Sequence, residues 1–166
     1  MGSAPKFVEI LQVLARHEVD FILVGGMAAI IAGAPISTFD LDIVVAKTAE
    51  NMQRLLPALQ EMDARYLDPA GRHIVPDADK LATFRTHLLV TSLGALDVMV
   101  TIGAGLSYAD LIGDTQVSDV AGVQVRVLGL ETIILSKEQA NRDKDRATLP
   151  ILRRTLRLKQ EGRGES

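Results

Sequence analysis

The chain has 166 residues, a formal net charge of −3 and 48% hydrophobic residues, which is enough material for one domain with a sizeable core. It contains no cysteine, which excludes disulfide bridges and thiolate metal sites, and no uninterrupted apolar stretch of about 18 residues that would suit a membrane-spanning helix. We therefore expect a cytoplasmic protein with a single domain over residues 1–160 and a frayed tail over 161–166.

The charge is unevenly distributed along the chain. From residue 137 onward nine basic residues stand against five acidic ones, so this segment carries +4 and the preceding part carries −7. A basic segment on an acidic body can meet phosphate groups, and a solvated helix rich in ion pairs explains the same composition equally well.

The spacing of apolar residues predicts the elements of the first half of the chain: a helix over 7–17, a strand over 21–24, a helix over 27–34, a strand over 39–45 and a helix over 51–62. Residues 67–80 are dominated by Gly, Pro, Asp and His, and they predict a long loop of the kind that is often functional or mobile.

The second half predicts two hairpins, 83–91 with 95–102 and 116–120 with 123–127, followed by helices over 128–140 and 147–159. Helices interleave with strands, but the strands include hairpins. We therefore expect an α/β (α+β) fold, with a mixed β-sheet flanked by helices and with C-terminal helices.

Two carboxylates interrupt the apolar strand over 39–45. Asp40 and Asp42 project on the same side of a strand because side chains alternate between its faces, whereas Leu41, Ile43 and Val45 point into the core. Two like charges so close repel each other, and partial burial adds a desolvation cost. A divalent cation with a preference for oxygen ligands, Mg²⁺ or Mn²⁺, would remove both penalties. A surface strand with two solvated acids is the alternative.

A third acid occupies a comparable position. Asp97 is the only charged residue of the apolar stretch GALDVMVTI, where it shares a face with Met99 and Thr101. If this strand lies beside residues 39–45, three carboxylates converge and could hold two metal ions for phosphoryl chemistry. The alternative is a structural ion pair with an arginine such as Arg85 or Arg126.

A pair of glycines, Gly25 and Gly26, falls between a predicted strand and the start of a predicted helix. Glycine allows a phosphate to approach the backbone closely, and the N–H groups at a helix start favour an anion. A tight turn without a ligand explains the same two residues. The pair precedes the two acids by one short helix, so a phosphate cradle and a metal site could share one crevice.

Taken together, these features resemble the nucleotidyltransferase fold superfamily, and they are similar to its small bacterial members and to the nucleotidyltransferase toxins of abortive-infection systems. The resemblance rests on Gly25 and Gly26, on STFDLD with Thr38, Asp40 and Asp42, and on Asp97. The later stretch LETIILSKEQANRDKDR also looks like a helical element of that family, with a Lys followed by an R-x-K-D run. The likeness extends over about residues 7–155.

The resemblance implies a metal-dependent transfer of a nucleoside monophosphate from an NTP to an acceptor hydroxyl, with release of pyrophosphate. Asp40, Asp42 and Asp97 would bind Mg²⁺ or Mn²⁺, and Asp97 would also deprotonate or orient the acceptor. Gly25 and Gly26 would hold the triphosphate.

The remaining nucleotide contacts are expected from Thr38, Lys137 and Lys144. The spacing of Lys137, Asn141 and Lys144 predicts one shared helical face, whose positive charge would offset that of the triphosphate. A helix merely solvated by i, i+4 pairs such as Glu138 with Arg142 is the alternative. Many relatives carry an arginine two residues before the Thr, where this chain has Ile36, so phosphate neutralisation falls to other cations.

The acceptor is left open between RNA or tRNA, a protein hydroxyl and a small molecule. An alternative hypothesis is a non-catalytic module that binds a nucleotide or a partner protein from the same operon, for instance as half of a toxin–antitoxin pair. A third is a purely structural interaction domain.

Overall fold

The computed structural model describes residues 5–164. Its helices are α1 (Phe7–Arg16), α2 (Gly25–Ile31), α3 (Ala49–Glu61), α4 (Ala78–Thr83), α5 (Tyr108–Leu111), α6 (Leu130–Ala140) and α7 (Asp143–Gly164), with a 3₁₀ turn η1 (Ile112–Asp114). Its strands are β1 (Phe21–Val24), β2 (Asp40–Val45), β3 (Arg65–Tyr66), β4 (Thr86–Thr91), β5 (Gly94–Met99), β6 (Thr101–Ile102), β7 (Leu106–Ser107), β8 (Thr115–Val120) and β9 (Val123–Leu128).

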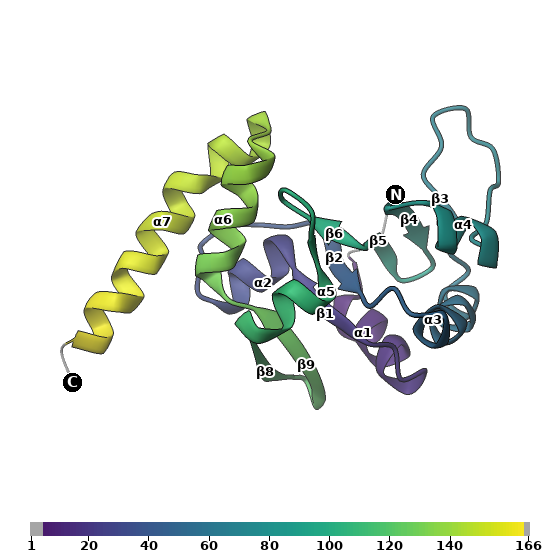
Figure 1. Cartoon of the computed structure of the whole chain (residues 1–166), viewed down its shortest axis with the longest axis horizontal. Helices are drawn as coiled ribbons and strands as arrows, with labels where there is room; N and C mark the ends of the chain where they lie inside the picture. The colour runs from purple at the N-terminus through teal and green to yellow at the C-terminus, as the bar shows by residue number, and fades with distance from the viewer. Residues whose placement is uncertain (1–4, 165–166) are drawn as a thin grey trace.

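The main sheet is mixed, as predicted. Its strand order is β3-β4-β5-β2-β1-β9-β8, and β6 pairs with β7 in a separate ribbon. β2 is antiparallel to β1 but parallel to β5, while β4 with β5 and β8 with β9 form antiparallel hairpins. The predicted fold class, a mixed sheet flanked by helices with further helices at the C-terminus, is therefore confirmed (Figure 1).

The core forms where strand alternation meets helix periodicity. Leu41 and Ile43 of β2 and Leu96 and Val98 of β5 are fully buried, and they belong to one apolar cluster with the inward residues of α1 and α3. α2 packs against β1, β2 and α6. Figure 1 shows α6 and α7 at one end of the molecule and α3, α4 and β3 at the other, with β2 and β5 between them.

Helices α2, α3 and α6 each begin two residues away from the predicted N-terminal end, and α7 begins four residues before it. α2 begins at Gly25, inside the glycine pair, and ends at Ile31, three residues before the predicted end. α7 begins at Asp143 and not at residue 147, because the buried carboxylate of Asp145 accepts hydrogen bonds from Arg142 and Lys137 and so holds this charged stretch. None of the helices formed by residues 5–164 combines the length and the apolar character that crossing a membrane requires.

Short elements account for the other differences. The predicted loop over 67–80 ends earlier than expected, because Asp77 caps the short helix α4 through a hydrogen bond from the backbone N–H of Lys80. The short elements β3, β7 and α5 were not predicted, and the last two residues of the predicted strand over 95–102 form β6, which pairs with β7 in the separate ribbon. The predicted frayed tail over 161–166 is helical as far as Gly164, and residues 165–166 lie outside the described part of the chain.

We expect Asn51→Ala to destabilise the fold by about 2 kcal/mol. The Asn51 side chain is fully buried. It accepts a hydrogen bond from the Asp20 N–H at 2.7 Å and donates to the carbonyl oxygens of Asp20 and Ala46, which ties α3 to the sheet. Removing it leaves buried backbone groups unpaired. Urea unfolding measures the change, and the exposed neighbour Gln53→Ala should stay within about 0.5 kcal/mol of the wild type.

Candidate active site

The acids at 40, 42 and 97 lie on one face of the sheet. β2 and β5 are parallel neighbours, and Asp42 stands directly opposite Asp97 while Asp40 stands opposite Ala95. Residues opposite each other across two strands project on the same side, so the three carboxylates share the face turned away from Leu41 and Ile43. The strand that carries Asp97 therefore lies beside the strand that carries Asp40 and Asp42, as predicted, and the two strands pair in parallel.

Asp42 and Asp97 are in direct contact. A hydrogen bond between the two side chains raises the pKa of Asp42 and lowers that of Asp97. Burial first, and then the negative charge of Asp97, raise the pKa of Asp42 to about 7. Burial also raises the pKa of Asp97, and the charge of Asp40 adds to this effect. Burial and mutual repulsion therefore favour a proton on this pair up to nearly neutral pH.

Neither arginine named as an alternative partner neutralises Asp97. The charged groups that act on it are Asp40 and Lys144, in addition to its hydrogen bond with Asp42, and Arg85 and Arg126 are not among them. The structural ion pair expected under that alternative is absent from the described residues.

The glycine pair adjoins the acids. Gly25 has φ +66°, and a Cβ at this position would lie 2.1 Å from Oδ2 of Asp42. A Cβ on Gly26 would lie 2.8 Å from Oγ1 of Thr38. The Thr38 hydroxyl in turn donates a hydrogen bond to the backbone oxygen of Asp40 at 3.0 Å, which fixes the start of β2. Close approach therefore favours glycine at both positions, and the glycine pair lies directly beside Asp42 and Thr38.

A cationic corner between α6 and α7 faces the acids. The positive charge of Lys144 lowers the pKa of both Asp42 and Asp97, opposing the effect of burial. Arg142 also acts on this site, because the charge of Asp42 contributes to the raised pKa of the Arg142 guanidinium after the larger contribution of Asp145. Sequence reasoning missed Arg142, although the R-x-K-D run contained it.

The corner is organised by Asp145, whose side chain is fully buried. Its carboxylate accepts hydrogen bonds from the Arg142 backbone N–H at 3.1 Å, from Nε of Arg142 at 2.7 Å and from Nζ of Lys137 at 3.3 Å. Lys137, a predicted nucleotide contact, is thus bonded to Asp145. These charge-assisted bonds lower the pKa of Asp145 despite the opposing effect of its burial.

The predicted helical face of Lys137, Asn141 and Lys144 is wrong. Asn141 ends α6 in the left-handed conformation, with φ 49° and ψ 40°, and the chain turns before α7 begins at Asp143. Asparagine adopts this conformation more readily than most residues. Lys144 reaches the acids because the chain turns a corner, and not because of helical periodicity.

The three acids do not form a ready-made metal cage. Within residues 5–164 no three acidic or histidine side chains are arranged so that they could hold a metal ion together. Asp40 is solvent-exposed and acts on the pair through its charge alone. The donor set still suits a hard divalent cation, because two half-buried carboxyl groups lie side by side, and such an ion could displace the proton that burial and repulsion favour there.

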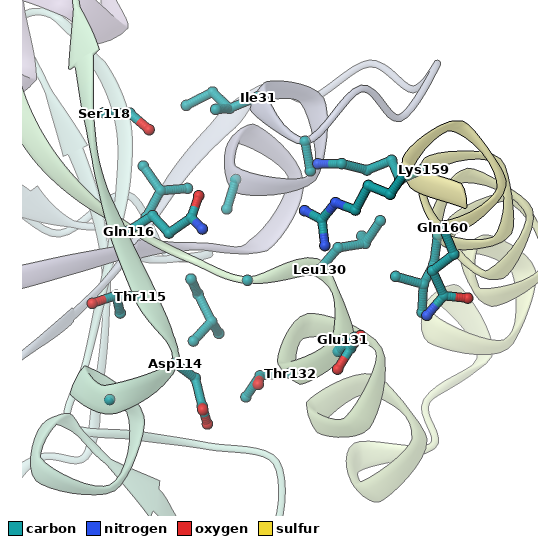
Figure 2. Close-up of a pocket in the computed structure, with 18 residues that line it drawn as sticks. Ile31, Asp114, Thr115, Gln116, Ser118, Leu130, Glu131, Thr132, Lys159 and Gln160 are labelled. Carbon is teal, nitrogen blue, oxygen red and sulfur yellow. The ribbon is translucent and has the colours of Figure 1, made fainter. Parts of the chain in front are cut away.

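The cavity drawn in Figure 2 lies elsewhere. It has a volume of about 420 Å³ and is bordered by α2, β8, the start of α6 and the end of α7. Lys159 and Gln160 belong to its α7 side, and Thr115, Gln116 and Ser118 to its β8 side (Figure 2). None of the predicted site residues lines it, so it is separate from the acid pair.

Comparison with known proteins identifies the fold. Neither a protein-family model nor a curated protein sequence matches this chain. Among solved structures, a protein of Thermotoga maritima assigned as a nucleotidyltransferase is 17% identical, with a TM-score of 0.57 over 87% of this chain and 88% of that one. The lincosamide antibiotic adenylyltransferase LnuA, bound to lincomycin, is 15% identical, with a TM-score of 0.58 over 89% and 94%.

A third similar structure is ANT(2″)-Ia in complex with adenylyl-2″-tobramycin. It is 15% identical, with a TM-score of 0.57 over 90% of this chain and 87% of that one. The chain therefore has the nucleotidyltransferase fold, as the sequence predicted.

The raised pKa of Asp42 predicts a pH-dependent gain in stability for Asp42→Asn. Native Asp42 retains its proton up to about pH 7, whereas the unfolded carboxyl loses it near its ordinary pKa of 3.8. The wild type therefore loses stability between about pH 4 and 7. In EDTA we expect the variant to unfold with a free energy higher by on the order of 2 kcal/mol at pH 8, with little gain at pH 3.5. A gain that is equal at both pH values would contradict the buried pair.

Gly25→Ala and Gly71→Ala form a matched pair. Both glycines have positive φ, +66° and +73°, but an added Cβ at Gly71 would meet nothing within 4 Å. Each substitution costs about 1 kcal/mol of backbone strain. Only Gly25→Ala also drives a methyl group into Asp42, so we expect it to lower the free energy of unfolding by at least about 2 kcal/mol in total. Equal losses in urea unfolding would show that Asp42 does not press on Gly25.

Proposed function

We propose that this protein is a metal-dependent nucleotidyltransferase that moves a nucleoside monophosphate from an NTP to an acceptor hydroxyl and releases pyrophosphate. The observation that carries the proposal is the contact of the half-buried side chains of Asp42 and Asp97, directly against Gly25, on the fold of known nucleotidyltransferases. A fold can host many activities, so the argument rests on the site and not on the likeness alone.

In the proposed reaction the acceptor oxygen attacks the α-phosphorus, the bond from that phosphorus to the bridging α–β oxygen breaks, and pyrophosphate leaves. Asp97 would take the proton of the acceptor hydroxyl, because burial raises the pKa of its carboxyl group and makes the carboxylate a stronger base. Asp40, Asp42 and Asp97 would hold Mg²⁺ or Mn²⁺, which would supply positive charge to the entering and leaving oxygens.

The triphosphate would lie between the glycine pair and the cationic corner. Gly25 and Gly26 leave room for a phosphate beside Thr38, because a side chain at either position would collide with its neighbour. Lys144 and Arg142 approach the acids from the α6–α7 corner. They would supply the charge that the arginine replaced by Ile36 supplies in many relatives.

The acceptor would be a small hydroxyl compound. LnuA is an adenylyltransferase of lincosamide antibiotics and is bound to lincomycin, and ANT(2″)-Ia is bound to adenylyl-2″-tobramycin. This chain matches most of the length of both proteins. Their acceptors are therefore suitable trial substrates, together with tRNA and protein.

A label-transfer assay tests the proposal. Incubation with each α-labelled NTP, Mg²⁺ or Mn²⁺, and lincomycin, tobramycin, total tRNA or a cell extract as acceptor should transfer label from at least one NTP. Asp42→Asn and Asp97→Asn should each lower the rate by at least about a hundredfold, since they remove a metal ligand or the proton acceptor.

The exposed Asp79→Asn serves as the control and should leave the rate within about twofold of the wild type. Thermal shift with Mn²⁺ and each NTP is measured in parallel. A thermal shift without any transfer of label would favour the non-catalytic nucleotide-binding module. That hypothesis is also consistent with the fact that no three acidic or histidine side chains of residues 5–164 are arranged to hold a metal ion. The absence of both signals would overturn the proposed function.

A further inference from the structure

A row of side chains runs straight across the sheet to the acid pair. Leu88 of β4 stands directly opposite Asp97 of β5, which stands opposite Asp42 of β2. Leu67 continues the row outward, because Tyr66 is paired with Leu89 and the Leu67 N–H donates to the Leu88 carbonyl oxygen at 2.9 Å. Neighbours in such a row lie about 5 Å apart and share one face.

The outer part of this row is apolar and open to solvent. Leu67 is 67% exposed and Leu88 is 47% exposed, and we call these two residues the leucine strip. Along β4, Thr86 and Leu88 on this face are exposed and Val90 is half-buried, whereas His87 and Leu89 on the other face are buried. Apolar residues without a function are usually scattered singly over a protein surface, whereas these two leucines are adjacent and lie in one row with the carboxyl pair.

The sheet order separates the two sides of the acid pair. Gly25 follows β1, the neighbour of β2, and the α6–α7 corner acts on Asp42, so the glycine pair and the cations lie toward β1. The leucine strip lies toward β4, on the other side of Asp97 (Figure 1). If the triphosphate occupies the first side, the second side receives the acceptor.

The charges on this second side are few. Among the described residues of β3, β4 and β5 that project on this face, only Arg65 and Asp97 are charged. A polycationic acceptor would find no acids here beyond the catalytic ones, and Arg65 would repel it. A polynucleotide would find a single cation and no exposed aromatic ring on these three strands for base stacking.

We infer that the leucine strip is the acceptor-binding surface and that it selects an amphipathic hydroxyl compound, with an apolar part over Leu67 and Leu88 and a hydroxyl at Asp97. This inference rests on the proposed nucleotidyl transfer, because it names the class of acceptor for that site. Each methylene group of the acceptor that is buried on the strip should tighten binding roughly fourfold.

The test uses two acceptors that differ only in their apolar part, methyl β-D-glucopyranoside and octyl β-D-glucopyranoside. Leucine methyl groups of the full chain are labelled with ¹³C, and each glucoside is titrated below its micelle-forming concentration without nucleotide. We expect octyl glucoside to shift the methyl signals of Leu67 and Leu88 in a saturable way, at least about tenfold more tightly than methyl glucoside. The signals of Leu135, an exposed leucine on α6, should not move.

Variants complete the test. Leu88→Gln and Leu67→Gln should each weaken octyl glucoside at least about fivefold, whereas Leu135→Gln should leave its affinity unchanged within twofold. Equal binding of the two glucosides, equal shifts at Leu135 and Leu88, or no effect of Leu88→Gln would overturn the inference. So would label transfer to tobramycin or tRNA that is insensitive to Leu88→Gln.

The titration contains no nucleotide, so its result is independent of the transfer assay. Saturable binding at the leucine strip without transfer of label from any NTP would contradict the proposed function, while transfer of label without binding at the strip would contradict this inference alone.

Discussion

The site depends on two carboxyl groups that face each other across adjacent parallel strands and share one proton. The strand register favours this contact, because Asp42 and Asp97 are directly opposite each other in the pairing of β2 with β5. Partial burial makes two adjacent negative charges costly, so the proton is held to an unusually high pH, as the pKa of Asp42 near 7 indicates. A site of this kind is stabilised by any cation that replaces the proton. The two adjacent carboxyl groups therefore lower the stability of the fold, and a bound cation would remove this cost.

Much of this arrangement could be predicted from the sequence, because it follows from local rules. Alternation along a strand placed Asp40 and Asp42 on one face, and a lone acid in an apolar strand made Asp97 their partner. The glycine pair was predicted beside them for its closeness to a phosphate. The structure adds a second reason that no local rule contains. Asp42 lies so close to Gly25 that there is no room for a side chain at this position. The parallel pairing that joins the acids was also outside local reasoning, since it connects residues more than fifty positions apart.

The cationic corner shows where sequence reasoning fails. A helical face was predicted for Lys137, Asn141 and Lys144, but Asn141 leaves the helix in the left-handed conformation. The turn brings Arg142 and Lys144 toward the acids and leaves Lys137 bonded to Asp145. The burial of Asp145 is what holds this corner, and a charged run such as NRDKDR gives no sign that one of its carboxylates is fully buried. Charged residues are normally exposed, so nothing in their pattern singles out Asp145.

The division of the sheet into two sides has a consequence for how such a site can change its acceptor. The acids are held by β1, β5 and α2, all of which belong to the packed centre of the molecule. The leucine strip lies on β4 and on the residue that follows β3, where the pairing partner is only two residues long and the side chains are open to solvent. Substitution of an exposed leucine leaves the buried register untouched, because the inward residues of β4 alternate with it. The chemistry and the acceptor surface are therefore carried by different residues of one continuous row, and the surface can vary while the carboxyl pair stays fixed.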